Sequence, residues 1–304
     1  MSNNKIQPPF LKSGDEVAII TPSWSVDEDK INDGINVLED WGLKVHTGRN
    51  ALKKDGPYSG TDSQRLSDLQ EMTDNKNIKA VLCSRGGYGM LRIIDKVDFS
   101  ALKRNPKWFV GFSDITILLT WLSESENIIS IHGEMPLNYR KKETSPETLE
   151  SLHGALFGHL KPVRWKGEFL RPADVTGEVT GGNLSLLYSL IGSVAGPKTR
   201  GRIFFIEDTG EYYYHLDRMM TSLRLAGKLS RLSALVSGGF TEMKETKIPW
   251  GRSAGQIISE SVAGYKYPVL SGFPAGHIDD NRAFYIGRQA KIEIRKDEAV
   301  LSYI

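Results

Sequence analysis

A serine at the junction of a predicted strand and helix is the first side chain of this sequence that could act as a nucleophile. Ser113 lies in the segment GFSDI (111–115), between an apolar strand pattern (108–111) and a helical pattern (115–122). On such a turn the hydroxyl projects beyond the sheet, and the amide of Asp114 at the helix N-terminus could stabilise an oxyanion. The alternative is that both residues simply cap the helix, since the segment lacks the second glycine of a G-x-S-x-G elbow.

A serine nucleophile needs a general base, and two of the six histidines have a suitable setting. His277 lies in the turn-rich segment FPAGHIDDN (273–281), directly after an apolar strand pattern. His132, in SIHGE (130–134), has a similar setting and is the second candidate. A loop at the carboxyl end of a strand is where a mobile base is expected. The alternative for either histidine is a solvated or structural role.

The acid that would orient the base is predicted at the end of another apolar strand. Glu207 directly follows the run IFFI (203–206). A carboxylate buried there is costly unless it is paired, for example with an imidazole N–H group. Glu211 is a nearby competitor. The alternative is that Glu207 and Asp208 begin a solvated loop.

A glycine-rich segment, RGGYG (85–89), follows a predicted strand at 80–83 and can bring backbone amides close to a ligand. We predict that Arg85 and Tyr88 of this segment bind the substrate. The glycine order is G-G-x-G, which excludes the dinucleotide fingerprint G-x-G-x-x-G, and a plain strand-to-helix turn is the alternative. The sequence has no metal-ligand spacing such as H-E-x-x-H, so we expect no metal and no cofactor.

The elements that must position these residues alternate between strand and helix over the first 130 residues or so. Apolar runs predict strands at 16–21, 43–47, 80–83 and 108–111. Helical patterns lie between and after them: one repeats Ile31, Ile35, Leu38 and Trp41 and ends at Gly42, one follows Thr61 or Asp62, and one covers 115–122. This alternation predicts a parallel sheet covered on both faces, with ligands beyond the carboxyl ends of its strands.

The remaining chain divides into a connecting region and a second domain. We place the first domain at 1–135, with the nucleophile, and the connecting region at 136–175, with a charged tract (141–143) and one helix (147–157). The second domain, 176–304, carries Glu207 and His277. Its pattern predicts a helix opening near Asn183, strands at 202–206, 234–237 and 268–270, a helix near 216–225, and antiparallel strands at 291–295 and 299–303.

Composition excludes several classes of protein. With 304 residues, 39% hydrophobic and 25% charged, the chain is typical of a soluble globular protein of two ordinary domains or one large one. Its net charge of +2 and lack of a basic arm give no indication of nucleic-acid binding. The single cysteine, Cys83, excludes an internal disulfide framework and a thiolate zinc cluster. Residues 1–10 lack the apolar core of a signal peptide and 115–122 is too short to span a bilayer, so we expect a cytoplasmic protein without membrane contact.

Several segments together resemble the LD-carboxypeptidase family (peptidase family S66) over nearly the whole chain. In chain order the matching segments are GDEVAIITPS (14–23), CSRGGYG (83–89), NPKWFVGFSDIT (105–116), GGNLS (181–185), IEDTGE (206–211) and Gly276-His277 with Asn281 and Gly287. The combination of RGGYG with GFSD is specific to this family. Two positions depart from its pattern: Glu134 stands where a proline is usual, and Phe284-Tyr285 where the family tends to have Leu-Pro. Both departures bear on the shape of the pocket and not on the triad.

This resemblance implies a Rossmann-like N-terminal domain and a smaller, partly β C-terminal domain, with the active site between them. It implies a triad in which Ser113 is the nucleophile, His277 the general base and Glu207 the residue that orients the base. The oxyanion hole would use the amide of Asp114 and one from the Gly86-Gly87 turn. The resemblance also implies a homodimer.

The usual activity of the family, removal of the terminal D-alanine from muropeptide tetrapeptides in cell-wall recycling, is the expected function. The alternative within the family is an immunity-type amide hydrolase of an aminoacyl-nucleotide peptide antibiotic. That branch has a longer chain with an extra aromatic loop, whereas Trp165 is the only tryptophan in the connecting region of this chain. A non-catalytic nucleotide- or sugar-binding protein is a further alternative, but it would have no need of Ser113, Glu207 and His277 together.

Overall fold

The computed structural model describes residues 5–140 and 144–304, so the charged tract at 141–143 and the first four residues lie outside the described part. The chain forms two compact units, of which the first contains residues 1–160 and 279–286 and the second contains residues 161–278 and 287–304. The division at 135 and 175 that the sequence suggested stays a prediction.

The first unit is built on a six-stranded sheet with the order β12-β5-β4-β3-β1-β2. Its strands are β1 (Glu16–Ile20), β2 (Lys44–Thr47), β3 (Ile78–Cys83), β4 (Trp108–Gly111), β5 (Ser130–His132) and β12 (Phe284–Ile286). All neighbouring pairs are parallel except β12, which runs antiparallel to β5. Consecutive residues of β3 and β4 are buried, which shows that both faces of the sheet are covered and confirms the predicted α/β fold class.

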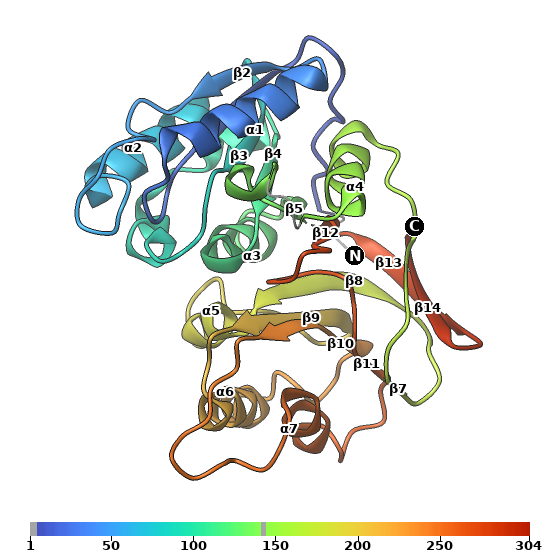
Figure 1. The fold of residues 1–304 in the computed structure, drawn as a ribbon. Coiled ribbons are helices and arrows are strands. Elements are labelled where there is room, and N and C mark those ends of the chain that lie inside the picture. The colour runs from blue at the N-terminus through green and yellow to red at the C-terminus, as the bar shows by residue number, and fades with distance from the viewer. Residues whose placement is uncertain (1–4, 141–143) are drawn as a thin grey trace. The chain divides into compact units, whose positions relative to one another are not determined.

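Helices surround this sheet and follow local sequence signals. They are α1 (Glu28–Asp40), α2 (Asp62–Asp74), α3 (Thr116–Glu124) and α4 (Pro146–Phe157) (Figure 1). Thr61 caps α2 through a capping box with Gln64, and Gly42 follows α1 with φ of +81°, the left-handed conformation expected after a helix. Short 3-10 turns fill the connections, including η4 (Ser113–Ile115) directly before α3.

The second unit contains an eight-stranded mixed sheet with the order β6-β14-β13-β8-β9-β10-β11-β7. Its strands are β6 (Val163–Trp165), β7 (Phe169–Leu170), β8 (Asp174–Asn183), β9 (Arg202–Thr209), β10 (Ala234–Thr241), β11 (Val269–Leu270), β13 (Gln289–Arg295) and β14 (Glu298–Tyr303). Strands β8 to β11 pair in parallel, whereas β13 and β14 form the antiparallel pair that the sequence predicted.

Three helices complete the second unit: α5 (Leu184–Ser189), α6 (Tyr213–Leu225) and α7 (Ala254–Ser261). Helices α6 and α7 lie beside each other on one face of the sheet (Figure 1), where they enclose an apolar core with Phe204 and Ile206 of β9 and Leu235 of β10. Glu207 directly follows the core residue Ile206 on β9.

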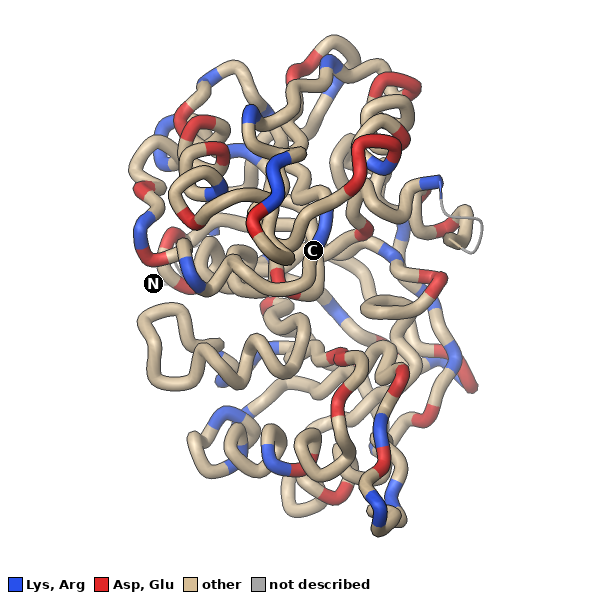
Figure 2. The backbone as a smooth tube through the Cα atoms, turned by 60° about the vertical axis from the view of Figure 1, so that its left-hand side comes forward, with Lys and Arg blue, Asp and Glu red and all other residues tan. Residues whose placement is uncertain are grey.

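Charged residues of both signs are interspersed along the backbone of each unit (Figure 2). This distribution agrees with the small net charge of +2. Interspersed charges are typical of a solvated protein surface.

Candidate active site

The turn that carries Ser113 is tight and conformationally strained. The fully buried strand β4 leads through Phe112 into η4, and Ser113 has φ of +60°, a left-handed conformation that costs a non-glycine residue about 1–3 kcal/mol. A Cβ added at Gly111 would lie only 2.7 Å from Cγ2 of Ile115, so the turn also requires glycine there. This is the geometry of a nucleophile elbow, even though the second glycine of the G-x-S-x-G pattern is absent.

The glycine-rich segment passes directly beside this turn. A Cβ added at Gly86 would lie 2.9 Å from Cβ and 3.0 Å from Oγ of Ser113, and 3.5 Å from the backbone nitrogen of Asp114. Gly87 has φ of +107° and packs on the ring of Trp24, which leaves no room for a side chain. Only glycine therefore lets the backbone come this close to the serine. The amides of Asp114 and of the Gly86-Gly87 turn stay predicted oxyanion donors.

The sequence interpretation missed a group of buried polar residues around this turn. The Asp114 carboxylate is fully buried and accepts hydrogen bonds from the hydroxyl of Ser23 and the backbone N–H of Met90. Arg65 of α2 is buried nearby and donates to carbonyl groups of the neighbouring loops. A serine directly after Pro22 was the available signal, but an isolated Pro-Ser pair does not predict burial.

In the second unit, Glu207 and His277 form a directly hydrogen-bonded pair. The carboxylate of Glu207 is completely buried at the end of β9, and its Oε2 lies 2.7 Å from Nδ1 of His277. The same oxygen also accepts the backbone N–H of His277 at 3.2 Å. A carboxylate at Nδ1 stabilises the tautomer with its proton on Nδ1 and its lone pair on Nε2, which is the form that a general base needs.

Gly276 makes this pairing possible. It has φ of +104°, and an added Cβ would lie 2.7 Å from Oε2 of Glu207. We expect Gly276→Ala to lower kcat/KM about 10²-fold, because displacing the acid by about 1 Å misaligns the imidazole. Gly192→Ala is the matched control, since Gly192 also has a positive φ (+88°) but open space around its added Cβ. Equal kcat/KM for the two variants would contradict this reading of the pair.

Two alternatives that the sequence left open have other surroundings. His132 is not in a loop as expected but in β5, where it is fully buried and stacks on Phe284 with ring centroids 4.6 Å apart. The Glu211 carboxylate contacts Nδ1 of His215, four residues later, and not His277. Both observations favour Glu207 and His277 over these competitors.

Comparisons with known proteins show the family to which this chain belongs. Residues 17–133 match the LD-carboxypeptidase N-terminal domain, and residues 176–292 match the LD-carboxypeptidase C-terminal domain. The chain belongs to the LD-carboxypeptidase family. It is therefore an enzyme of the carboxypeptidase kind, and the resemblance predicted from its motifs is confirmed.

Individual relatives of this family match nearly the full chain. A protein of Bacillus subtilis (strain 168) named "Probable murein peptide carboxypeptidase" is 33% identical over 97% of this chain and 94% of its own length. The crystal structure of muramoyltetrapeptide carboxypeptidase from Oxalobacter formigenes superposes with a TM-score of 0.86 at 28% identity, covering 94% of this chain and 97% of that one. The "Microcin C7 self-immunity protein MccF" of Escherichia coli is 26% identical over 80% of this chain and 79% of its own length.

Asp208 fixes the strand end that carries Glu207 in this family member. Its buried carboxylate accepts hydrogen bonds from Nδ2 of Asn183 (2.9 Å), from the backbone N–H of Ser185 (3.0 Å) and from that of Thr209 (2.9 Å). Burial, together with the adjacent Glu207 carboxylate, raises the pKa of Asp208 to about 7. The side chain thus connects the end of β9 to the first turn of α5. Because Glu207 and Asp208 are both buried, they do not begin a solvated loop.

The two predicted substrate-binding side chains differ in their surroundings. Arg85 donates from Nη1 to the carbonyl of Ser25 at 2.7 Å, and its guanidinium lies over the ring of Trp24. Tyr88 is 41% exposed, and its ring lies near that of Tyr58. Arg85 therefore links the glycine-rich segment to residues 24–25, whereas Tyr88 is the more accessible of the two. Their role in substrate binding stays a prediction.

The departure from the family pattern at Glu134 has a structural explanation within the first unit. The buried Glu134 accepts hydrogen bonds from the Met135 amide and from Nδ2 of Asn138 through Oε1, and from Nδ2 of Asn281 through Oε2. Tyr285, at the other departure, is buried and donates its hydroxyl proton to the carbonyl of Ala155. Both residues hold the 279–286 segment in this unit.

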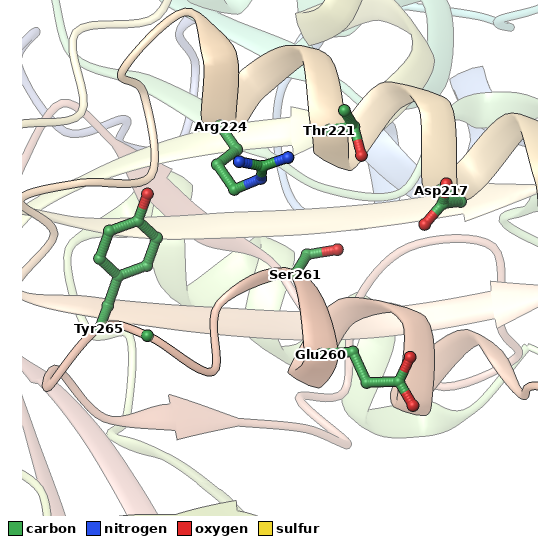
Figure 3. Close-up of a pocket in the computed structure, with 7 residues that line it drawn as sticks. Asp217, Thr221, Arg224, Glu260, Ser261 and Tyr265 are labelled. Atoms are coloured by element: carbon green, nitrogen blue, oxygen red, sulfur yellow. The ribbon is translucent and has the colours of Figure 1, made fainter.

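Two surface cavities of the second unit lie away from Glu207 and His277. The first, of about 490 Å³, is bordered by the two helices α6 and α7, with the lining residues Asp217, Thr221, Arg224, Glu260, Ser261, Gly264 and Tyr265 (Figure 3). The second, of about 560 Å³, lies at the N-terminal ends of the same helices and includes Ser237 and Phe240. Neither cavity is lined by Glu207 or His277.

The described part of the chain contains neither a cluster of metal ligands nor a membrane-spanning helix. Within residues 5–140 and 144–304, no group of three or more His, Cys, Asp or Glu side chains is arranged to hold a metal ion. Over the same ranges, no helix has both the length and the apolar character that crossing a bilayer requires.

Proposed function

We propose that this chain is a serine carboxypeptidase that hydrolyses the L-D peptide bond to the terminal D-alanine of muropeptide tetrapeptides. The observation that carries the proposal is the fully buried Glu207 carboxylate hydrogen-bonded to Nδ1 of His277 at 2.7 Å. This hydrogen bond leaves Nε2 of His277 able to accept a proton from a nucleophile. Ser113, on its strained turn, has the conformation for that role. Relatives named murein peptide and muramoyltetrapeptide carboxypeptidases support the choice of substrate.

In the proposed acylation step, Oγ of Ser113 attacks the carbonyl carbon of the scissile bond while Nε2 of His277 accepts the hydroxyl proton. Glu207 stabilises the imidazolium that results. The carbonyl oxygen becomes an oxyanion, which accepts hydrogen bonds from the backbone amides of Asp114 and the Gly86-Gly87 turn. Collapse of this intermediate breaks the C–N bond, and the imidazolium donates its proton to the leaving amine of D-alanine.

Deacylation repeats the same proton transfers with water. His277 removes a proton from a water molecule, whose oxygen attacks the acyl carbon, and the proton is then returned to Oγ of Ser113 as the ester bond breaks. The products are the tripeptide carboxylate and a regenerated hydroxyl. Overall, the tetrapeptide and one water molecule give the tripeptide and D-alanine. No step requires a metal or a cofactor.

The setting of the reaction is part of the proposal. Free tetrapeptides reach the cytoplasm as imported wall fragments, so we propose that the enzyme acts there. We further propose a homodimer, as expected from the family, and light scattering of the purified chain checks this against a monomer.

An immunity-type amide hydrolase is the second candidate, because the chain is also similar to the MccF protein of Escherichia coli. Such an activity would favour an exposed aromatic side chain to stack on a nucleotide base. Trp165, the only tryptophan of the 136–175 region, is instead 5% exposed, and its Nε1 donates to the carbonyl of Ser271. Its ring packs edge-on against Phe273. Trp165 is therefore not available to stack on a base.

We expect the enzyme to release D-alanine from a soluble tetrapeptide at least about 10²-fold faster than from the pentapeptide or from the analogue with an L-L terminal bond. A pocket that holds one terminal carboxylate and one small D-methyl group has no room for another residue. A mismatched stereocentre tilts the scissile carbonyl away from the Asp114 amide, and loss of one oxyanion hydrogen bond costs about 3–4 kcal/mol of barrier. The measurement is kcat/KM for each peptide from released alanine.

An aminoacyl-nucleotide amide is the competing substrate in the same assay. Similar rates on L-D and L-L peptides would contradict the proposed selectivity. Faster hydrolysis of the aminoacyl-nucleotide amide than of the tetrapeptide would favour the immunity-type function. The Ser113→Ala variant serves as the blank for both substrates.

A further inference from the structure

The side chain of Asp114 belongs to a buried network of the first unit that the proposed mechanism does not use. Its Oδ2 accepts a hydrogen bond from the Ser23 hydroxyl at 2.6 Å and another from the Met90 backbone N–H at 2.9 Å. Its Oδ1 is buried and has no hydrogen-bond partner among the described residues. A fully buried carboxylate thus lies immediately next to Ser113, with both of its hydrogen bonds on one oxygen.

The two donors lie on either side of the glycine-rich turn. Met90 directly follows residues 85–89, so its N–H group fixes the end of this segment. Ser23 precedes Trp24, whose N–H group donates to the carbonyl of Gly86 at 3.3 Å. Through these two contacts the Asp114 carboxylate connects the turn that carries Ser113 to the backbone that lies beside it.

Arg65 closes the network from α2. Its buried Nη1 donates to the carbonyl of Pro22 at 2.6 Å and to that of Gly89 at 3.0 Å. Because Gly89 has φ of +148° and an added Cβ would lie 2.6 Å from Nη1, a larger residue does not fit at this position. The segments 22–24, 86–90 and 113–114 are therefore bonded into one assembly around Ser113.

Burying the charged Asp114 carboxylate costs folding free energy, because the charge is removed from water. Burial raises the pKa of Asp114 to about 6, opposed by the hydrogen bonds from Ser23 and Met90 and by the charge of Arg65. The titratable groups that face it are Arg65 from α2 and Cys83 from β3, whose thiol pKa is itself raised by burial. Asp114 is consequently mostly ionised at neutral pH although its surroundings favour the neutral form. Such a cost beside a nucleophile points to a functional reason.

We propose that Asp114 is a positioning residue whose carboxylate, through Ser23 and the Met90 amide, holds the glycine-rich turn in place against Ser113 for oxyanion binding. The proposal rests on the proposed nucleophilic role of Ser113. The side chain does not touch the substrate. It acts by keeping the backbone donors of residues 86–87 and 114 in one fixed arrangement.

The test is Asp114→Asn, an isosteric change that removes the charge and one acceptor. We expect kcat to fall about 10²-fold, as for loss of an oxyanion donor, while KM changes less than about threefold. The melting temperature above pH 6 should be unchanged or higher, because the cost of a buried charge is removed. Asp68→Asn is the matched control: Asp68 is also a buried aspartate of this unit, its pKa is also raised by burial, and it accepts hydrogen bonds from Asn50. It should leave kcat unchanged.

A pH profile separates positioning from a purely structural role. A folded-state pKa near 6 means that protonation below this pH removes the acceptor charge, in addition to protonation of the histidine base. In the wild-type enzyme kcat/KM should therefore fall more than tenfold per pH unit below about pH 6. Asp114→Asn should fall by no more than tenfold per unit, because only the base then titrates. Identical acid limbs, or a kcat within threefold of wild type, would overturn the proposal.

A fluorophosphonate that labels the nucleophilic serine provides a readout independent of the substrate. Its phosphonyl oxygen occupies the oxyanion site, so the rate of labelling at Ser113 should fall about 10²-fold in Asp114→Asn and not in Asp68→Asn. If labelling shows this difference between the variants but the wild-type enzyme releases no D-alanine, the proposed substrate is wrong and the positioning role stands. Equal labelling rates in wild type and Asp114→Asn would defeat the positioning role alone.

Discussion

Ser113→Ala is expected to lower kcat by about four or more orders of magnitude while leaving the fold intact. Without Oγ no acyl-enzyme can form, and removal of a triad nucleophile elsewhere leaves only the contribution of the oxyanion hole and substrate binding. The elbow itself should persist, because alanine at φ of +60° has a cost similar to that of serine and the contacts of Gly86 are unaffected. The measurement is release of D-alanine at saturating tetrapeptide, with circular dichroism as the check on folding.

Ser125→Ala is the matched control for this experiment. Ser125 is an exposed serine at the end of α3, the helix that begins just after the elbow, and its loss should change kcat less than twofold. Retention of even a tenth of the wild-type rate by a clean preparation of Ser113→Ala would rule out Ser113 as the nucleophile. Labelling by the fluorophosphonate at another serine would then identify its replacement.

His277→Ala is expected to be nearly as damaging as Ser113→Ala. The imidazole removes the proton from Oγ in acylation and returns it to the leaving amine, and the buried Glu207 carboxylate would be left without its partner at Nδ1. A histidine base is active only in its neutral form, so its protonation contributes a tenfold fall in kcat/KM per pH unit on the acid side. This contribution should be missing from the residual activity of His277→Ala.

His132→Ala is the comparison that decides between the two histidines. His132 is fully buried and its ring stacks on Phe284, so its removal should lower the melting temperature by several degrees and kcat much less than His277→Ala does. Thermal unfolding and kcat are measured on the same preparations. If His132→Ala instead lost most of the activity and His277→Ala retained it, the base would have to be reassigned.

Local sequence patterns were sufficient to predict most of the elements that carry the site. The capping box of Thr61 and Gln64, the left-handed Gly42 and the apolar run of β4 each depend on residues within one or two turns of one another. The strand β8 was missed, because its glycines do not form a strand pattern. One of them, Gly181, is required by tertiary contact: an added Cβ would lie 1.9 Å from the carbonyl oxygen of Phe205 on β9.

The sequence by itself determined the fold class, the family and the candidate nucleophile, because these depend on short motifs in a fixed order. Residue patterns alone left Glu207 and Glu211 open as the acid, and only the resemblance to the family chose between them. The tertiary structure shows the pairing itself: Glu207 contacts His277, 70 residues away, whereas Glu211 contacts His215, four residues later. It also placed 279–286 in the first unit and buried Asp114 against Ser23 and Met90. Burial and long-range pairing depend on how segments far apart in the sequence pack together. Local residue patterns carry no information on those contacts.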